Sequence, residues 1–440
     1  GIKNKVPTDG SKIIFSRVSS LLLPDRSGII IVLSSCILTN PTLSPRGETS
    51  ACPFLPLEDI TTKGDKFMKF LECFSNFLSK SLLIKFIKIF LGFKEGKQEI
   101  VCLRFFLFLG DSGFQLFFFV KKYFGDSYNK IPIRYVKQDK KLGTGHALLM
   151  VEEFIKEDFL MLYGDDLYSF KDIQKVLENK NCMLLQKLED VSNFGVVSVD
   201  GKGKVIDVIE KPTEAVDSNL INIGVFHFSK EIFGFLHKVE LSSRSEYELT
   251  DAVKMLAEEN KMHYTIATEF WKPVGYPWHI LSATQTILEH RTDELMVHKG
   301  TVKAGAMVEP EASIDTGSVV EKGARIMGLV VIGRDVKIGE NVTIVGPSVI
   351  SSGTIIGKGS VVERSVIGVR GRIGDNCHIH NSVIGDDATV KDSIKTEYNS
   401  PEKTILVDVK GKKVDTGLTQ LGAFVAKGAV VSRSTVPGEV

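Results

Sequence analysis

The amino-acid sequence predicts an α/β domain with a mostly parallel sheet, followed by a parallel β-helix. Two observations support this fold class. Strands alternate with helices over about 250 residues of the chain, which is typical of parallel sheets. In the last third, Val or Ile recurs at every sixth position. With 440 residues, the chain is long enough to form two or three domains with full cores.

The six-residue repeat runs without a miss from Val302 to Val362. A helix would repeat near 3.6 residues and an ordinary strand near 2, so neither explains this period. Branched aliphatic residues at a period of six are typical of a β-helix, in which coils stack about 4.8 Å apart. A β-sandwich would instead show alternating residues and turn signals every 8–12 positions. After a one-residue slip the repeat continues at Ile367, Ile373 and Ile379, and after a second slip it continues at Ile384 and Val390.

The α/β pattern is clearest from residue 131 onward. We expect strands at residues 131–138, 158–164, 182–188 and 220–229, and a hairpin at 193–212 whose turn is centred on glycines. We expect helices at residues 146–155, 170–180, 246–260 and 279–296. The predicted domains are therefore residues 1–296 and, for the β-helix, 297–440.

Composition narrows the classes of partner. The net charge is +1, so nothing indicates nucleic acid as a partner. The six cysteines contain no C-x-x-C spacing, which favours reduced thiols and a cytoplasmic location. No uncharged apolar stretch of 18 residues occurs, so we expect no membrane-spanning helix and no membrane partner.

Candidate ligand-binding residues follow the predicted strands, where ligands bind in open α/β sheets. Gln138 offers an amide that can pair with a base edge, and Gly143 in the segment LGTGHAL allows close approach of the backbone. Asp165 directly follows a buried strand, where a carboxylate could hold Mg²⁺ against phosphates. Taken singly, Gln138 could be a surface amide and Asp165 could be part of a turn.

A second group of candidates lies further along the chain. It comprises Gly195, the tripeptide Glu210-Lys211-Pro212, and Asn222, an uncharged polar residue within a predicted strand. Lys211 alone could be a solvated charge. The order and spacing of both groups together favour a binding site.

This ordered set closely resembles the sugar-1-phosphate nucleotidylyltransferases, in particular the bifunctional uridylyltransferase/acetyltransferase family that makes UDP-N-acetylglucosamine. The resemblance covers roughly residues 120–440 and includes Q-x4-G-T-G-H-A, G-D after a strand, E-K-P, I-N-x-G, E-Y-x-L-T-D and F-W-x-x-V-G-x-P-W. It implies a Rossmann-like nucleotidyltransferase domain, a left-handed parallel β-helix of hexapeptide repeats, and a homo-oligomer, trimeric or larger.

The resemblance also implies an activity. A nucleoside triphosphate, with UTP favoured by His146, would donate its nucleotidyl group to a sugar 1-phosphate, with N-acetylglucosamine 1-phosphate favoured, and pyrophosphate would leave. The metal and the positioning of substrates do most of the work in such a transfer.

The same resemblance assigns roles to individual residues. Asp165 matches the Mg²⁺-binding aspartate, and Lys211 matches a lysine that contacts the sugar phosphate. Both are the predicted catalytic residues. The predicted nucleotide-binding residues are Gln138, Gly143 and Thr144, and the predicted sugar-binding residues are Gly195, Glu210 and Asn222.

The sequence departs from the family pattern in the N-terminal region. The family's glycine-rich loop L-A-A-G-x-G-T-R-L-x-P corresponds here to LSSCILTNPTLSP, residues 33–45, without those glycines or the arginine, and Cys52 stands in place of a lysine. Pro273 stands where the family has a second metal ligand. Two interpretations of the first 120 residues stay open, namely a divergent N-terminal half, which would suit a non-catalytic subunit that binds sugar nucleotides, and a damaged reading of the sequence.

The β-helix departs from its acetyltransferase relatives. Asp375 stands at the position of their histidine, and Leu418-Thr419-Gln420 replaces a basic triplet. His378 and His380 could substitute, in which case the protein would use acetyl-CoA to acetylate glucosamine 1-phosphate. Otherwise the β-helix would serve as a scaffold.

Overall fold

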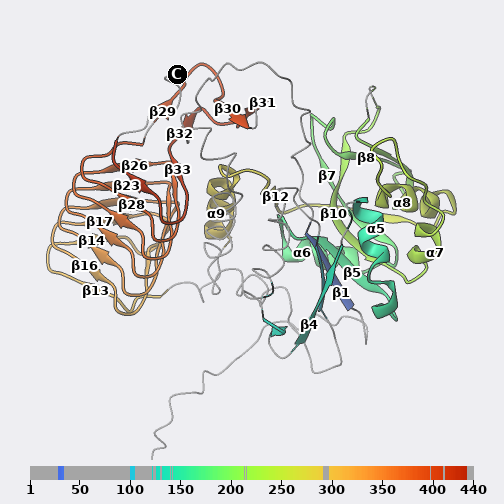
Figure 1. Ribbon diagram of the computed structural model, residues 1–440, viewed down its shortest axis with the longest axis horizontal. Helices are drawn as coiled ribbons and strands as arrows, with labels where there is room; N and C mark the ends of the chain where they lie inside the picture. The colour runs from blue at the N-terminus through green and yellow to red at the C-terminus, as the bar shows by residue number, and fades with distance from the viewer. Residues whose placement is uncertain are drawn as a thin grey trace, which may run out of the picture.

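The computed structural model describes residues 28–33, 100–104, 121, 125–128, 131–138, 140, 142–212, 214, 216–290, 297–396, 398–409 and 412–433. Figure 1 shows an α/β domain, a stack of short strands in regular coils, and helix α9 (His279–Glu289) between them. The predicted fold class, a mostly parallel α/β sheet followed by a parallel β-helix, is confirmed.

The α/β domain is built on one mixed sheet. Its central strands β5, β1, β2 and β4 run parallel to one another, whereas β10 runs antiparallel to its neighbours β5 and β7. In spatial order the strands are β11 (His263–Ile266), β7 (Cys182–Lys187), β10 (Leu220–Phe228), β5 (Phe159–Tyr163), β1 (Gly28–Leu33), β2 (Ile100–Arg104), β4 (Ile131–Lys137) and β3 (Ser127–Tyr128). The other elements of this domain are α5 (Gly143–Leu149), the 3₁₀ helix η1 (Glu152–Phe154), β6 (Asp166–Tyr168), α6 (Phe170–Leu177), β8 (Gly195–Val199), β9 (Val205–Glu210), α7 (Ile232–Leu236), α8 (Leu249–Glu258) and β12 (Trp271–Pro273).

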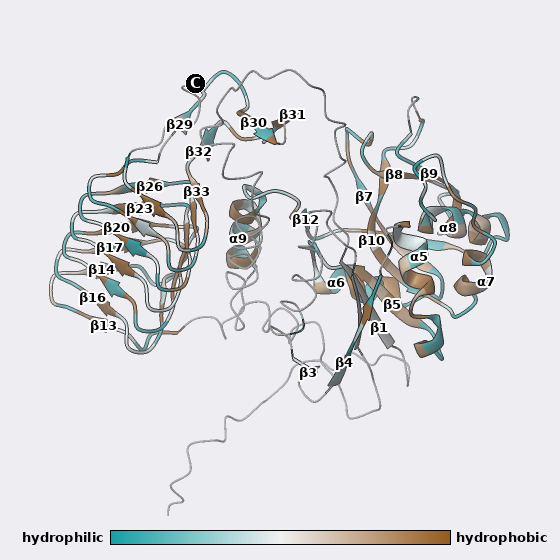
Figure 2. Ribbon diagram, viewed as in Figure 1, coloured by the Kyte–Doolittle hydropathy of each residue, from teal (hydrophilic) through white to brown (hydrophobic). Residues whose placement is uncertain are grey.

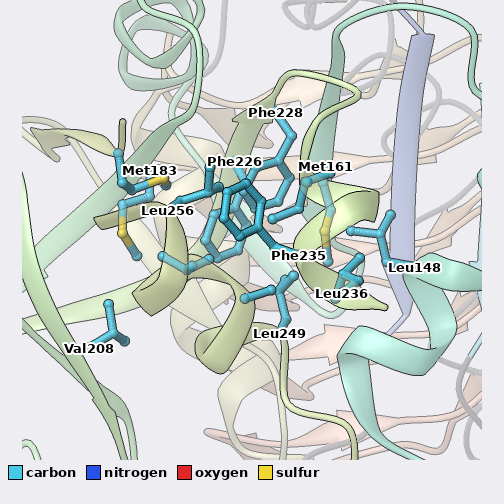
Figure 3. Close-up of a cluster of buried hydrophobic side chains, with 14 of the residues drawn as sticks. Leu148, Met161, Met183, Val208, Phe226, Phe228, Phe235, Leu236, Leu249 and Leu256 are labelled. Carbon is cyan, nitrogen blue, oxygen red and sulfur yellow. The ribbon is translucent and has the colours of Figure 1, made fainter. Parts of the chain in front are cut away.

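The core of this domain lies where α5, α7 and α8 pack against the sheet. Strands β5 and β10 are largely apolar along their length (Figure 2). Phe159, Phe226 and Phe228 are fully buried there, and the last two rings stack with their centroids 4.9 Å apart. Figure 3 shows that Leu236 and Leu249, from α7 and α8, point into the same cluster.

All four predicted helices differ from their expected bounds. Helix α6 ends at Leu177 instead of residue 180, and α9 ends at Glu289, with residues 291–296 outside the described residues. Helix α8 begins at Leu249 instead of residue 246, because the backbone N–H and carbonyl of Tyr247 pair with Leu142 and Gly145 and so cannot continue the helix. Helix α5 begins at Gly143, earlier than expected, and ends at Leu149.

The solenoid has three parallel sheets, and strands about one coil apart in the sequence pair with each other. Arg325, for example, pairs with Thr343, and Thr343 pairs with Val361. The repeated Val and Ile side chains point inward, and Ile326, Ile344 and Val362 are fully buried. The first sheet contains β13 (Thr301–Val302), β16 (Val319–Val320), β19 (Lys337–Ile338), β22 (Ile355–Ile356), β25 (Arg372–Ile373), β28 (Thr389–Val390) and β34 (Val430–Val431). The second contains β14 (Met307–Val308), β17 (Arg325–Met327), β20 (Thr343–Val345), β23 (Val361–Glu363) and β26 (His378–His380). The third contains β15 (Ser313–Ile314), β18 (Val330–Ile332), β21 (Ser348–Ile350), β24 (Val366–Ile367), β27 (Val383–Ile384) and β33 (Phe424–Val425).

Helix α9 joins the two parts of the chain. Ile280 and Leu288 on α9 form a buried cluster with Val349, Val366 and Val383, which lie on successive strands of the third solenoid sheet. The predicted boundary at residues 296 and 297 falls at the edge of a segment, residues 291–296, that lies outside the described residues.

An excursion from the solenoid packs near the start of α9. Trp278 is buried with Ile405 and Leu421, and Tyr276 stacks on the Trp278 ring at 4.6 Å. The excursion contains two small ribbons, which pair β29 (Tyr398–Asn399) with β32 (Gln420–Leu421) and β30 (Leu406–Val409) with β31 (Lys412–Asp415). Within the described residues, no helix is long and apolar enough to span a membrane.

Candidate functional site

The predicted site residues lie along the edge of the sheet where the parallel strands end. Gln138 directly follows β4, and Asp165 follows β5 after a single glycine. Strands β1 and β2 lie between these two strands. Because neighbouring strands are about 4.8 Å apart, these two residues lie at separate positions along the same edge of the sheet.

Strand β1 ends at the sheet edge that carries the predicted site residues. It ends at Leu33 in the middle of the sheet edge, between β5 and β2. The segment that corresponds to the family's glycine-rich loop, residues 33–45, begins there. Apart from Leu33 it lies outside the described residues, as does Cys52.

Gln138 is 1% exposed, and the nitrogen of its side-chain amide, but not the oxygen, is hydrogen-bonded to described residues. Its Nε2 donates to the Gly143 carbonyl at 3.2 Å and lies 2.8 Å from His146 Nδ1. Its Oε1 is buried and has no hydrogen-bond partner among the residues that the structure describes. The amide therefore has an acceptor atom that the described residues leave unpaired.

The segment around Gly143 pairs with the segment that precedes α8. Gly145 N–H donates to the Tyr247 carbonyl at 2.8 Å, and Tyr247 N–H donates to the Leu142 carbonyl at 2.7 Å. The Thr144 hydroxyl accepts a bond from Leu249 N–H at the start of α8, at 3.2 Å. The described contacts thus give Thr144 a capping role in addition to its predicted nucleotide contact.

Gly143 has no room for a side chain. Its φ is +87°, and a Cβ there would lie 2.7 Å from the Tyr247 carbonyl oxygen.

We expect Gly143→Ala to lower the free energy of unfolding by about 1–2 kcal/mol for the left-handed backbone alone. The added methyl group should also separate the two paired segments and raise the KM for nucleotide. Gly201→Ala is the matched control, because Gly201 has a φ of +70° and open space around its Cβ position. Thermal unfolding and nucleotide KM would be measured for both, and equal effects would contradict the packing argument.

Gly195, Glu210 and Asn222 come together on the other side of the site. Gly195 pairs with Glu210 across the β8–β9 hairpin, and a Cβ on Gly195 would lie 3.0 Å from Glu210 Oε2 and 3.8 Å from the Asn222 Cβ. Asn222 Oδ1 accepts the Gly224 N–H at 2.9 Å. This leaves the Asn222 amide NH₂ as the donor end of that side chain.

Arg244 is a charged residue of this cluster that the sequence patterns do not single out. Its guanidinium lies 3.4 Å from Glu210 Oε1 and 2.8 Å from Glu248 Oε1. Burial raises the pKa of Glu210, and the charges of Arg244 and Lys211 oppose that rise. Arg244 lies in the loop just before the motif E-Y-x-L-T-D, and this position was the sequence feature that could have identified it as a site residue.

Lys211 is exposed, with a φ of +45° just after the end of β9.

Asp165 lies beside a small ribbon formed by β6 and β12. Its carbonyl accepts the Val274 N–H at 3.1 Å, and Pro273, at the family's second-ligand position, pairs with Asp166. Burial raises the pKa of Asp166 to about 6, although Trp271 Nε1 donates to its carboxylate at 2.8 Å. Among the described residues no three His, Cys, Asp or Glu side chains form a metal cluster. A single carboxylate still suits Mg²⁺, which commonly takes one or two carboxylates and completes its shell with phosphates and water.

The histidines of the solenoid lie on strand β26. His378 is exposed, whereas His380 is buried, with its Nε2 2.7 Å from the Arg364 guanidinium and 3.1 Å from Glu363. A guanidinium can only donate hydrogen bonds. A ring nitrogen engaged in this way is a poor general base, so these contacts do not favour acetyl transfer at His380.

Comparison with known proteins gives matches over both parts of the chain. The model of the nucleotidyl transferase family matches residues 115–290, and that of the GMPPB C-terminal domain matches residues 308–414. The bifunctional protein GlmU of Methanococcus maripaludis is 31% identical over 67% of this chain and 71% of its own.

Two further relatives have related descriptions. The bifunctional sugar-1-phosphate nucleotidylyltransferase/acetyltransferase of Sulfurisphaera tokodaii is 30% identical over 69% of this chain and 75% of its own. The UTP–glucose-1-phosphate uridylyltransferase AglF of Haloferax volcanii is 32% identical over 39% of this chain and 73% of its own.

Proposed function

This chain belongs to the family of sugar-1-phosphate nucleotidylyltransferases that resemble GlmU, and on that basis we propose that it transfers a uridylyl group from UTP to N-acetylglucosamine 1-phosphate. The reaction forms a bond between a sugar phosphate oxygen and the α-phosphorus and releases pyrophosphate. We further propose Mg²⁺ as the metal.

The observation that carries the choice of base is the state of the Gln138 amide. Both of its donor hydrogens face acceptors of the protein, and its Oε1 has no partner among the described residues. An acceptor placed at the base edge favours uracil, whose N3 carries a hydrogen. It disfavours cytosine, whose N3 is itself an acceptor and would leave both atoms unpaired.

The choice of sugar is supported by the cluster around Gly195. The Glu210 carboxylate can accept hydrogen bonds from sugar hydroxyls. The Asn222 side-chain oxygen accepts the Gly224 N–H. The NH₂ group of Asn222 can therefore donate a hydrogen bond to a carbonyl such as that of an acetamido group. Glucose 1-phosphate lacks that carbonyl, so we expect it to be the poorer substrate.

The remaining proposed roles follow from charge. Asp165 would hold Mg²⁺ against the phosphates, and the ion supplies positive charge that stabilises the transition state. Lys211 would contact the sugar phosphate, and its exposed side chain on a left-handed backbone position leaves it able to reach out from β9. Together they would hold the attacking and leaving groups in line.

A substrate matrix tests this proposal. UTP, dTTP, CTP, ATP and GTP would each be combined with N-acetylglucosamine 1-phosphate and glucose 1-phosphate in the presence of Mg²⁺, and pyrophosphate release would be measured. We expect the highest kcat/KM for UTP with N-acetylglucosamine 1-phosphate, and loss of turnover on chelation of the metal. The absence of pyrophosphate from every pair would reject an enzymatic function, and a preference for CTP would reject the base assignment.

A further inference from the structure

His146 is linked to Gln138 by the shorter of the two hydrogen bonds that join the Gln138 amide to described residues. Its Nδ1 lies 2.8 Å from Gln138 Nε2, whereas the bond from Nε2 to the Gly143 carbonyl measures 3.2 Å. His146 is the fourth residue of α5, so the end of β4 and the first turn of this helix meet at the amide.

The chemistry of these partners fixes which end of the amide faces the protein. A backbone carbonyl can only accept, so the atom that faces the Gly143 carbonyl must be Nε2. The same nitrogen faces His146 Nδ1, so Nδ1 must also be an acceptor, which places the ring hydrogen on Nε2 of His146. Burial lowers the pKa of His146 and so favours this neutral ring.

The imidazole itself is held by a second segment of the chain. The Tyr247 ring stacks on it with the centroids 6.2 Å apart. The backbone of Tyr247 is in turn fixed by its bonds with Leu142 and Gly145. The ring nitrogen is therefore presented to Gln138 from a position that two paired segments of the domain determine.

We propose that His146 is a positioning residue for base selection, which acts by holding the Gln138 amide with its oxygen toward the nucleotide. This inference rests on the proposed uridylyl transfer. In the held orientation Gln138 Oε1 meets the N3 hydrogen of uracil. If the amide rotated by half a turn, its NH₂ would face the base instead and would suit the N3 acceptor of cytosine.

The test is the ratio of kcat/KM for UTP to that for CTP in His146 variants. His146→Leu and His146→Ala both remove the acceptor, and we expect each to lower the kcat/KM for UTP by up to about tenfold, the size of one hydrogen bond. The kcat/KM for CTP should fall less, so the ratio should fall. His146→Asn supplies an oxygen near the position of Nδ1 and should restore most of the ratio.

His237→Leu is the matched control. This histidine lies in the same domain and is exposed, and its Nε2 lies 2.8 Å from the Glu152 carboxylate, so its replacement should leave the ratio unchanged. An equal loss for UTP and CTP in both acceptor-free variants would show that His146 is merely structural and would overturn the inference.

A binding measurement separates failure of this inference from failure of the proposed function. If the wild-type protein turns over no nucleotide, the proposed function fails, and the affinities for UTP and CTP measured by titration calorimetry in the same variants give the ratio instead. A wild-type protein that neither binds nor turns over UTP in preference to CTP would overturn both.

Discussion

Replacing Asp165 with asparagine is expected to lower kcat for nucleotidyl transfer on the order of a thousandfold, because the metal's contribution to the transition state is worth several kcal/mol. The change removes the carboxylate charge but keeps the size of the side chain. The carbonyl of residue 165 would still accept the Val274 N–H that joins it to the β12 segment. We therefore expect little change in thermal stability.

The measurement is the rate of pyrophosphate release as a function of Mg²⁺ concentration. The variant should need more Mg²⁺ for its residual activity, since one negative ligand is lost. Asp190→Asn is the control, because Asp190 is an exposed carboxylate in the same domain that accepts hydrogen bonds from the neighbouring Ser192. Retention of more than a tenth of wild-type kcat by Asp165→Asn would contradict the assignment of the metal ligand.

Replacing Ile344 with aspartate is expected to unfold the central coils of the solenoid. Ile344 is fully buried, and it pairs with Ile326 on one side and Val362 on the other. A carboxylate without a partner in such a core costs about 3–5 kcal/mol or more. Each coil is stabilised by its neighbours, so damage at this position extends to the adjacent coils.

Thr343→Asp is the matched control for this prediction. Thr343 is the preceding residue of the same strand, points outward, and pairs with Arg325, a favourable neighbour for a carboxylate. Differential scanning calorimetry should show a large fall in the solenoid transition for Ile344→Asp and a small change for Thr343→Asp. Equal shifts in the two variants would contradict the inward orientation of the repeat.

The solenoid could be predicted in detail because its signal is local and repeated. Each hexad provides one inward branched residue, and stacking places like residues above one another, so the buried column Ile326, Ile344 and Val362 follows directly from the sequence. The α/β elements were predictable for a related reason. The spacing of apolar residues along a strand or an amphipathic helix indicates which of its side chains are buried.

Strand direction and long-range contacts were not predictable in the same way. Strand β10 runs antiparallel between β5 and β7, yet its apolar run is the same in either direction. The contact of Arg244 with Glu210 joins residues 34 positions apart, and the orientation of the Gln138 amide depends on a histidine ring stacked on Tyr247. Such features depend on packing between segments that a single sequence does not relate to one another.

The packing of α9 on the solenoid has a consequence for how the length of the protein can vary. One helical turn rises about 5.4 Å and neighbouring strands lie about 4.8 Å apart, so successive turns of α9 meet successive coils. Val349, Val366 and Val383 mark three such coils, and Val331 and Phe424, on the strands before and after them in the same sheet, pack against the same cluster. Coils inserted or lost outside this group would change the length of the stack in whole units and leave the α9 contact as it is. Evolution or design could therefore lengthen or shorten the solenoid without moving the ribbon beside Asp165.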